Sequence, residues 1–242
     1  MQRTIDKHLE NLILQIFEAK AVAIRDVDGG EKPFLYSSGN YGPGYVMIKG
    51  LVGWKSIFKP LLFRLANEVA LKVPDIDFVV GNVSGGQVPG WVLSEYLEIL
   101  LGRPVPFVYA RGTRKKGGQQ ELLVGHKDNP NISKGSNGLI VEELVNFAET
   151  TTNSAEAVRD AGCVVTHAAC ILFYGNPESI KTLHNHSVEM IHLFTLEELL
   201  YVAAKHVTHS TEAISAYREF LANPLSWQEK RGLKPVLTGG TQ

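Results

Sequence analysis

The sequence has little cysteine, almost no net charge and no long apolar run. Its 242 residues include two cysteines, Cys163 and Cys170, in apolar surroundings and without a CxxC motif, which predicts buried, reduced thiols. A formal net charge of -1 gives no global attraction to nucleic acid or membrane, so anion binding must come from local clusters. No apolar run approaches the roughly 20 residues that span a bilayer, and residues 1–10 are polar, which favours a cytoplasmic protein.

What is present is an alternation of short apolar runs and amphipathic stretches, which indicates an α/β fold. Strands are expected at 77–81, 105–109, 139–142, 164–173 and 190–194, and helices at 6–23, 54–73, 90–101, 154–161, 195–206 and 211–221. This order predicts a mostly parallel twisted sheet flanked by helices, with a small N-terminal hood. We expect three parts: a helix and hood (1–52), a core (53–207), and a C-terminal helix and tail (208–242) that is loosely ordered from residue 223 onward.

The most informative stretch runs from Gly138 to Ser154. An apolar run ends in two adjacent carboxylates, Glu142 and Glu143, and a polar cluster follows before a helical pattern. The cluster consists of Thr150, Thr151, Thr152, Asn153 and Ser154. We interpret it as a turn that binds a phosphate at a helix N-terminus, with the carboxylates placed to hold ribose hydroxyls or a hydrated cation. The alternative is an ordinary strand–loop–helix corner in which Ser154 caps the helix.

Two further segments follow predicted strands. The paired glycines Gly85 and Gly86 allow close approach of the backbone, which suits a cradle for pyrophosphate or ribose but also a plain turn. A basic loop with Arg111, Arg114 and Lys115 lies between glycines; it could close over a pyrophosphate or be merely solvated. Since ligands bind beyond the carboxyl ends of parallel strands, we expect these segments to converge with the acidic pair.

Other ligand classes are disfavoured by what these segments lack. The basic loop has no interleaved aromatic residues, which argues against nucleic-acid binding. The histidines, such as His206 and His209, have no carboxylate or cysteine partner at metal-ligand spacing. We therefore predict no metal site built from protein side chains alone.

The order and spacing of these segments resemble the orotate phosphoribosyltransferases, a family of type I phosphoribosyltransferases. The resemblance covers roughly residues 34–200. It includes the segments Tyr36–Gly39, Gly81–Pro89, Val108–Arg111, Leu123–Gly125 and Leu193–Leu200, together with the acidic strand. The resemblance implies a type I phosphoribosyltransferase-like fold in a cytoplasmic homodimer. It also implies transfer of phosphoribosyl from phosphoribosyl pyrophosphate (PRPP) to a pyrimidine-like base, with Mg²⁺ present and pyrophosphate released.

The resemblance also implies roles for individual residues. Glu142 and Glu143 would hold the ribose 2′- and 3′-hydroxyls, and residues 150–154 would bind the 5′-phosphate. Arg111 and Lys115 match positions that contact pyrophosphate in that family. The acidic pair here is separated from Thr150 by residues 146–149, and Thr152 and Asn153 replace two glycines of the family's turn.

The cations expected to read the base are also missing. Ser37 stands where the family has a lysine, and Tyr174 and Gly175 stand where it has Asp-Arg; Gly112 and Gly117 replace a lysine and a histidine of the basic loop. Because orotate is an anion, we expect its turnover to be weak or absent. Two alternatives stay open: a non-catalytic PRPP- or nucleotide-binding regulatory protein, and a phosphoribosyltransferase for a neutral base.

Overall fold

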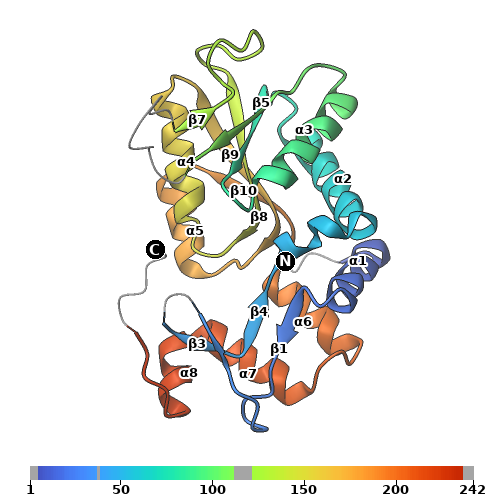
Figure 1. The fold of residues 1–242 in the computed structure, drawn as a ribbon, viewed down its shortest axis with the longest axis vertical. Coiled ribbons are helices and arrows are strands. Elements are labelled where there is room, and N and C mark those ends of the chain that lie inside the picture. Colours follow the sequence, from blue (N-terminus) through green and yellow to red (C-terminus); the bar gives the residue numbers. More distant parts are fainter. Residues whose placement is uncertain (1–4, 37–38, 112–121, 237–242) are drawn as a thin grey trace. The chain divides into compact units, whose positions relative to one another are not determined.

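The computed structural model describes residues 5–36, 39–111 and 122–236, which form two compact units (Figure 1). One unit comprises residues 52–196, and the other combines residues 1–51 with 197–242. The sequence predicts three parts, and this division stays a prediction. Grouping residues by their contacts does not test whether any part folds by itself. Within the described residues, no helix is long and apolar enough to cross a membrane.

The larger unit is built on a six-stranded sheet with the strand order β10-β9-β8-β5-β6-β7. Its strands are β5 (Phe78–Asn82), β6 (Phe107–Ala110), β7 (Leu123–Val124), β8 (Asn137–Val145), β9 (Val164–Phe173) and β10 (Glu189–Thr195). All neighbouring strands are parallel except β6 and β7, which are antiparallel. The mostly parallel sheet predicted from the sequence is therefore confirmed, and its apolar runs are buried because helices cover both faces.

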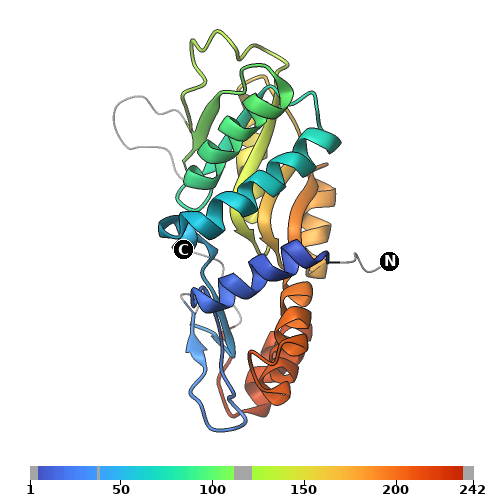
Figure 2. The same ribbon diagram turned by 90° about the vertical axis from the view of Figure 1, so that its right-hand side faces the viewer.

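Two pairs of helices cover the sheet. α2 (Lys55–Lys72) and α3 (Gln87–Leu101) lie side by side on one face, and α4 (Glu149–Asp160) and α5 (Pro177–Asn185) lie on the other (Figures 1 and 2). Val80 of β5 and Ile140 of β8 are buried in the apolar cluster that includes Val158 of α4. Because side chains alternate along a strand, Asn82 and Glu142, two residues further on, face α4 as well.

The smaller unit contains two two-stranded sheets and several helices. Its strands are β1 (Val22–Ile24), β2 (Phe34–Leu35), β3 (Tyr41–Gly42) and β4 (Gly44–Val46); β1 pairs antiparallel with β4, and β2 with β3. Its helices are α1 (Lys7–Glu18), α6 (Leu196–Lys205), α7 (Thr211–Ala222) and α8 (Pro224–Lys230), and the 3-10 helix η1 (Ile48–Gly53) lies at the boundary of the two units. The β2–β3 hairpin lies in the segment where the hood is expected, and its role as a hood stays a prediction.

The prediction of a loosely ordered tail is wrong for residues 224–230, which form α8. Asn223 caps this helix by accepting a hydrogen bond from the Ser226 N–H. Trp227 and Gln228 are fully buried, and Gln228 bonds to the backbone N–H of Tyr41 at 2.8 Å. A seven-residue helix leaves little periodicity in the sequence, so its order comes from this tertiary burial, which the sequence pattern does not show.

Three helix predictions also need correction. The first helix ends at Glu18, because residues 22–24 pair as a strand with β4. Residues 177–185, where no helix is expected from the sequence, form α5, with Asn176 as its cap and Pro177 in its first turn. The helix after the acidic strand begins at Glu149 instead of Ser154.

Candidate functional site at the carboxyl edge of the sheet

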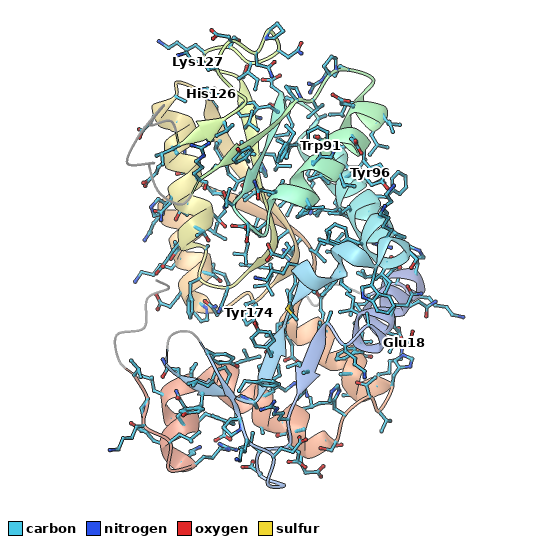
Figure 3. The ribbon with its side chains drawn as sticks, viewed as in Figure 1. Glu18, Trp91, Tyr96, His126, Lys127 and Tyr174 are labelled. Carbon is cyan, nitrogen blue, oxygen red and sulfur yellow. The ribbon has the colours of Figure 1, made fainter. Side chains whose placement is uncertain are left out.

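The carboxyl ends of β5, β6, β8 and β9 share one edge of the sheet, as they must in a parallel arrangement. Two strand-to-helix corners stand at this edge: the first corner, residues 83–86 between β5 and α3, and the second corner, residues 146–148 between β8 and α4. Figure 3 shows Tyr174, which follows β9, at this edge, whereas His126 and Lys127 lie at the opposite edge of the same unit. The glycine corner after β5 and the segment after the acidic strand therefore lie at the same edge of the sheet, as expected.

The first corner lies against the carboxylate of Glu143. A Cβ atom added at Gly85 would overlap the Glu143 carboxylate, and one added at Gly86 would overlap the carbonyl oxygen of Val141. Neither glycine has a positive φ. Close approach of the Val141 carbonyl requires glycine at Gly86, whereas the Glu143 side chain beside Gly85 could rotate away. The predicted proximity of the glycine pair and the acidic strand is thus present in the structure for Glu143.

Glu142 has a different environment from its neighbour. It is 8% exposed and accepts a hydrogen bond of 2.6 Å from Nδ2 of Asn82, and a second side-chain hydrogen bond joins it to Thr150. Burial raises the pKa of Glu142 to about 8; the Asn82 hydrogen bond acts in the opposite direction, and the negative charge of Glu143 raises the pKa further. Glu142 is therefore largely a neutral acid at pH 7.

The two carboxylates point to opposite faces of the sheet, as adjacent residues of a strand do. Glu142 faces α4 together with Asn82, and Glu143, which is only partly buried, contacts the first corner at the start of α3. The sequence predicts that both carboxylates lie at one edge of the sheet, but it does not predict that their surroundings differ. Only Glu143 combines partial exposure with contact to a glycine corner.

The second corner differs from the prediction. Residues 150–154, expected to be a turn, belong to α4, and the connection is Asn146, Phe147 and Ala148. Ala148 caps the helix with φ 66°, a left-handed conformation that is uncommon outside glycine, asparagine and aspartate. Glu149 is the first residue of α4, so it brings a negative charge to the helix end that would otherwise favour an anion.

The five predicted phosphate-binding residues have different positions within α4. Thr150 and Asn153 are exposed and Ser154 is partly buried. Thr152 is buried, and its hydroxyl donates to the carbonyl oxygens of Ala148 and Glu149 at 3.1 Å. Thr151 is 1% exposed, and its Oγ1 has no hydrogen-bond partner in the described part of the chain. Helix formation therefore disperses a cluster that is contiguous in the sequence.

Asn146 in the second corner is held by another loop. Nδ2 of Asn176 donates to both the carbonyl oxygen and Oδ1 of Asn146 at 3.0 Å. The same Asn176 side chain accepts from the backbone N–H of Ser179 and so caps α5. The loop with Tyr174 and Gly175, where the resemblance expects Asp-Arg, is thereby tied to the second corner.

The predicted cations are only partly described. Arg111 directly follows β6, and its backbone N–H donates to the carbonyl oxygen of Leu122 at 2.8 Å. Arg114 and Lys115, along with Ser37, lie outside the described residues. Residues 5–36, 39–111 and 122–236 contain no group of three or more His, Cys, Asp or Glu side chains that could hold a metal ion.

Asn82 is the residue of this site that sequence reasoning missed. Besides Glu142, its Nδ2 contacts the carbonyl oxygen of Thr150 at 3.3 Å, and its Oδ1 is buried without a partner among the described residues. The available signal was its position: Asn82 is the one polar side chain of β5, and it stands at the strand's carboxyl end.

Comparison with known proteins assigns this arrangement to a class. No family model matches the chain. It is 28% identical over 200 residues to the orotate phosphoribosyltransferase of Ruegeria sp. (strain TM1040), covering 82% of this chain and 84% of that protein. The UMP synthase of Leishmania donovani superposes with a TM-score of 0.66 at 19% identity, over 88% of this chain and 42% of that longer chain. The orotate phosphoribosyltransferase of Mycobacterium tuberculosis H37Rv in complex with PRPP gives 0.56 at 17% identity, over 78% of this chain and 97% of that one.

These superpositions, with the sheet order and the two corners, define the class: the chain has the fold of the type I phosphoribosyltransferases. Within this class, the curated proteins that match it over most of its length include orotate phosphoribosyltransferases at 25–28% identity. The chain is a divergent relative of that family, as the sequence segments indicate.

Proposed function

We propose that this chain is a phosphoribosyltransferase of the orotate type, which transfers phosphoribosyl from PRPP to a pyrimidine-like base and releases pyrophosphate. One observation carries the proposal: at the carboxyl edge, the Gly85–Gly86 corner lies against the Glu143 carboxylate. The backbone N–H groups of a glycine turn suit a phosphate oxygen, and a carboxylate suits ribose hydroxyls. The relationship to orotate phosphoribosyltransferases supports PRPP-dependent chemistry of this family.

In this proposal the residues act mainly by position and charge. The Glu143 carboxylate accepts hydrogen bonds from ribose hydroxyls, and the first corner approaches the pyrophosphate of PRPP. Arg111, at the end of β6, contributes positive charge toward the departing pyrophosphate, and we assign the same role to Arg114 and Lys115 of the basic loop. Asn82 Oδ1 and Thr151 Oγ1, which are buried and without partners in the described chain, are candidates for hydrogen bonds with buried water.

Mg²⁺ fits this site as a companion of the substrate. The described residues provide no three-ligand cluster, whereas Mg²⁺ commonly takes most of its ligands from substrate phosphates and water. When bound, the ion neutralises charge on the pyrophosphate oxygens. We also propose, from the family resemblance, that the protein is a cytoplasmic homodimer.

A second candidate is a non-catalytic protein that binds PRPP or a nucleotide. Glu149 at the start of α4, and Thr152 and Asn153 in place of the family's two turn glycines, make the second corner less suited to a phosphate. Tyr174 and Gly175 supply no cation for an anionic base. If the protein is catalytic, the absence of a cation at Tyr174 and Gly175 favours a neutral base as its substrate.

Pyrophosphate release distinguishes the candidates. The full chain is incubated with PRPP and Mg²⁺, separately with orotate, uracil and adenine, and PRPP binding is measured by calorimetry in parallel. The proposed function predicts binding and release of pyrophosphate with a pyrimidine, and chelation of Mg²⁺ should abolish the release. PRPP binding without release with any base supports the second candidate. Absence of PRPP binding contradicts the proposed function and leaves only a nucleotide as the ligand of the second candidate.

A further inference from the structure

The two carboxylates at the end of β8 are chemically alike but structurally separated. Glu142 is fixed in a buried network with Asn82 and Thr150, whereas Glu143 is partly exposed and contacts Gly85. Two groups with such different surroundings are poorly suited to do the same task for a ligand. The contacts of Asn82 indicate how the tasks are divided.

Asn82 connects three elements through one amide nitrogen. Its Nδ2 is 2.6 Å from Oε1 of Glu142 on β8 and 3.3 Å from the carbonyl oxygen of Thr150 in the first turn of α4, and Asn82 itself ends β5. At 3% exposure, the side chain has no room to swing into solvent. The amide therefore fixes both the Glu142 carboxyl and the start of α4 relative to the first corner, which begins at the next residue.

We propose that Asn82 is a positioning residue that holds the Glu142 carboxyl against the first turn of α4, and that Glu143 alone of the acidic pair contacts the sugar of the ligand. This division rests on the proposed function, since it assigns parts within the same site. Glu142 then acts through α4: its side-chain hydrogen bond to Thr150, together with the contact of Asn82 to the Thr150 carbonyl oxygen, fixes the first turn of that helix. The acidic pair, read from the sequence as one ribose-binding unit, becomes one contact residue and one anchor.

The charge state of Glu142 agrees with an anchor. Glu143 on β8 is its charged neighbour, the Cys170 thiol lies opposite it on β9, and Asn82 and Thr150 contribute neutral groups from β5 and α4. Glu143 and burial both oppose ionisation of Glu142, and the described network supplies it with amide and hydroxyl groups but no cation. A neutral acid in this network holds its neighbours without needing a counter-ion.

The test separates the two carboxylates with isosteric changes. Glu143→Gln and Glu142→Gln are compared with the wild type for PRPP affinity by calorimetry at pH 7 with Mg²⁺. We expect Glu143→Gln to weaken binding by roughly tenfold or more, the scale of a lost hydrogen bond to a charged group. Because glutamine keeps the acceptor for Asn82, Glu142→Gln should stay within about threefold. Equal losses in both variants overturn the division of roles.

The positioning role is tested without any ligand. Asn82→Ala should raise hydrogen–deuterium exchange of the amides of the first two turns of α4 and should shift the titration of the Glu142 carboxyl, followed by carbon NMR, to higher pH. The titration reports the hydrogen bond itself, which a general loss of packing would not shift in that direction. Asn67→Ala is the matched control, because Asn67 also donates its amide to a backbone carbonyl, that of Phe63, but on α2.

The outcomes distinguish this inference from the proposed function. Unchanged exchange in α4 and an unchanged Glu142 titration in Asn82→Ala overturn the positioning role, whether or not PRPP binds. If the wild type does not bind PRPP, the proposed function is wrong and Glu143 has no sugar to contact, so the division of roles fails. The positioning role is then decided by the exchange and titration results alone.

Discussion

The two corners at the carboxyl edge both connect a strand to a helix, but their residues differ in chemistry. The first corner has two glycines that lie against Glu143 and the Val141 carbonyl, and no acidic residue. The second has no glycine: Ala148 adopts the left-handed conformation, Asn146 is bound by Asn176, and a glutamate opens the helix. The first corner packs its glycine backbone closely against neighbouring groups, whereas the second is built from residues that carry side chains.

In the proposed function, this difference makes the two corners unequal as phosphate sites. Glycine backbone is present at the first corner, where a pyrophosphate would lie in the proposed function. At the second corner, the family resemblance implies binding of the 5′-phosphate. The negative charge of Glu149 at the helix N-terminus disfavours an anion there. We therefore expect the first corner to matter more for affinity, and the following experiments test this contrast.

The largest expected effect concerns the buried acid beneath the second corner. The pKa of Glu142 is raised from 4.5 to about 8, so the folded protein keeps a proton that the unfolded chain releases as pH rises between these values. Stability should fall with rising pH over that window, by at most about 5 kcal/mol at roughly 1.4 kcal/mol per unit. Glu142→Gln should remove this decline, as measured by urea unfolding from pH 5 to 9.

The matched control for that experiment is Glu143→Gln on the same strand. It should keep the decline but move it to lower pH, because the charge of Glu143 contributes to the raised pKa of Glu142. If wild type and Glu142→Gln show the same pH dependence of unfolding, the neutral, anchored state of Glu142 is contradicted.

The next largest effect concerns the glycine corner. Gly86→Ala places a Cβ atom onto the Val141 carbonyl oxygen, a backbone atom that cannot rotate away. We expect a loss of about 2–3 kcal/mol in the free energy of unfolding, as for other overpacked positions. In Gly53→Ala, the control, the added Cβ has no atom within 4 Å, so a change of less than about 0.5 kcal/mol is expected. Similar stabilities for the two variants would contradict the close packing of this corner.

A smaller effect is expected from the charge at the second corner. Glu149→Gln removes a carboxylate from the first turn of α4, so PRPP affinity should rise two- to fivefold, about 0.3–1 kcal/mol, at low ionic strength. The same change costs the helix a favourable dipole interaction of similar size. Glu212→Gln, an exposed first-turn glutamate of α7, should show that loss of stability with no gain in affinity. Unchanged PRPP affinity in Glu149→Gln would show that the charge of Glu149 does not cause the difference between the two corners.

The sequence predicted the framework of this site better than its details. Buried strands of a parallel sheet appear in the sequence as continuous apolar runs, and the strand at 164–173 was predicted with its correct bounds. The start of α4 was missed because its first turn is rich in threonine and asparagine, which favour caps and turns unless tertiary contacts override them. Asn82 was missed because its role depends on Glu142, 60 residues away in the chain. Pairings of this kind have no local signal.

The smallest effect separates the two corners by backbone conformation alone. At Ala148, glycine would relieve a positive φ worth about 1–2 kcal/mol, but it would also remove a buried methyl group and add chain entropy to the unfolded state. These contributions nearly cancel, so Ala148→Gly should change stability by less than about 1 kcal/mol. Ala155→Gly, at a buried position inside the same helix with no strain to relieve, should cost about 1–2 kcal/mol more. Equal losses in urea unfolding would show that the second corner stores no backbone strain, and charge alone would then distinguish it from the glycine corner.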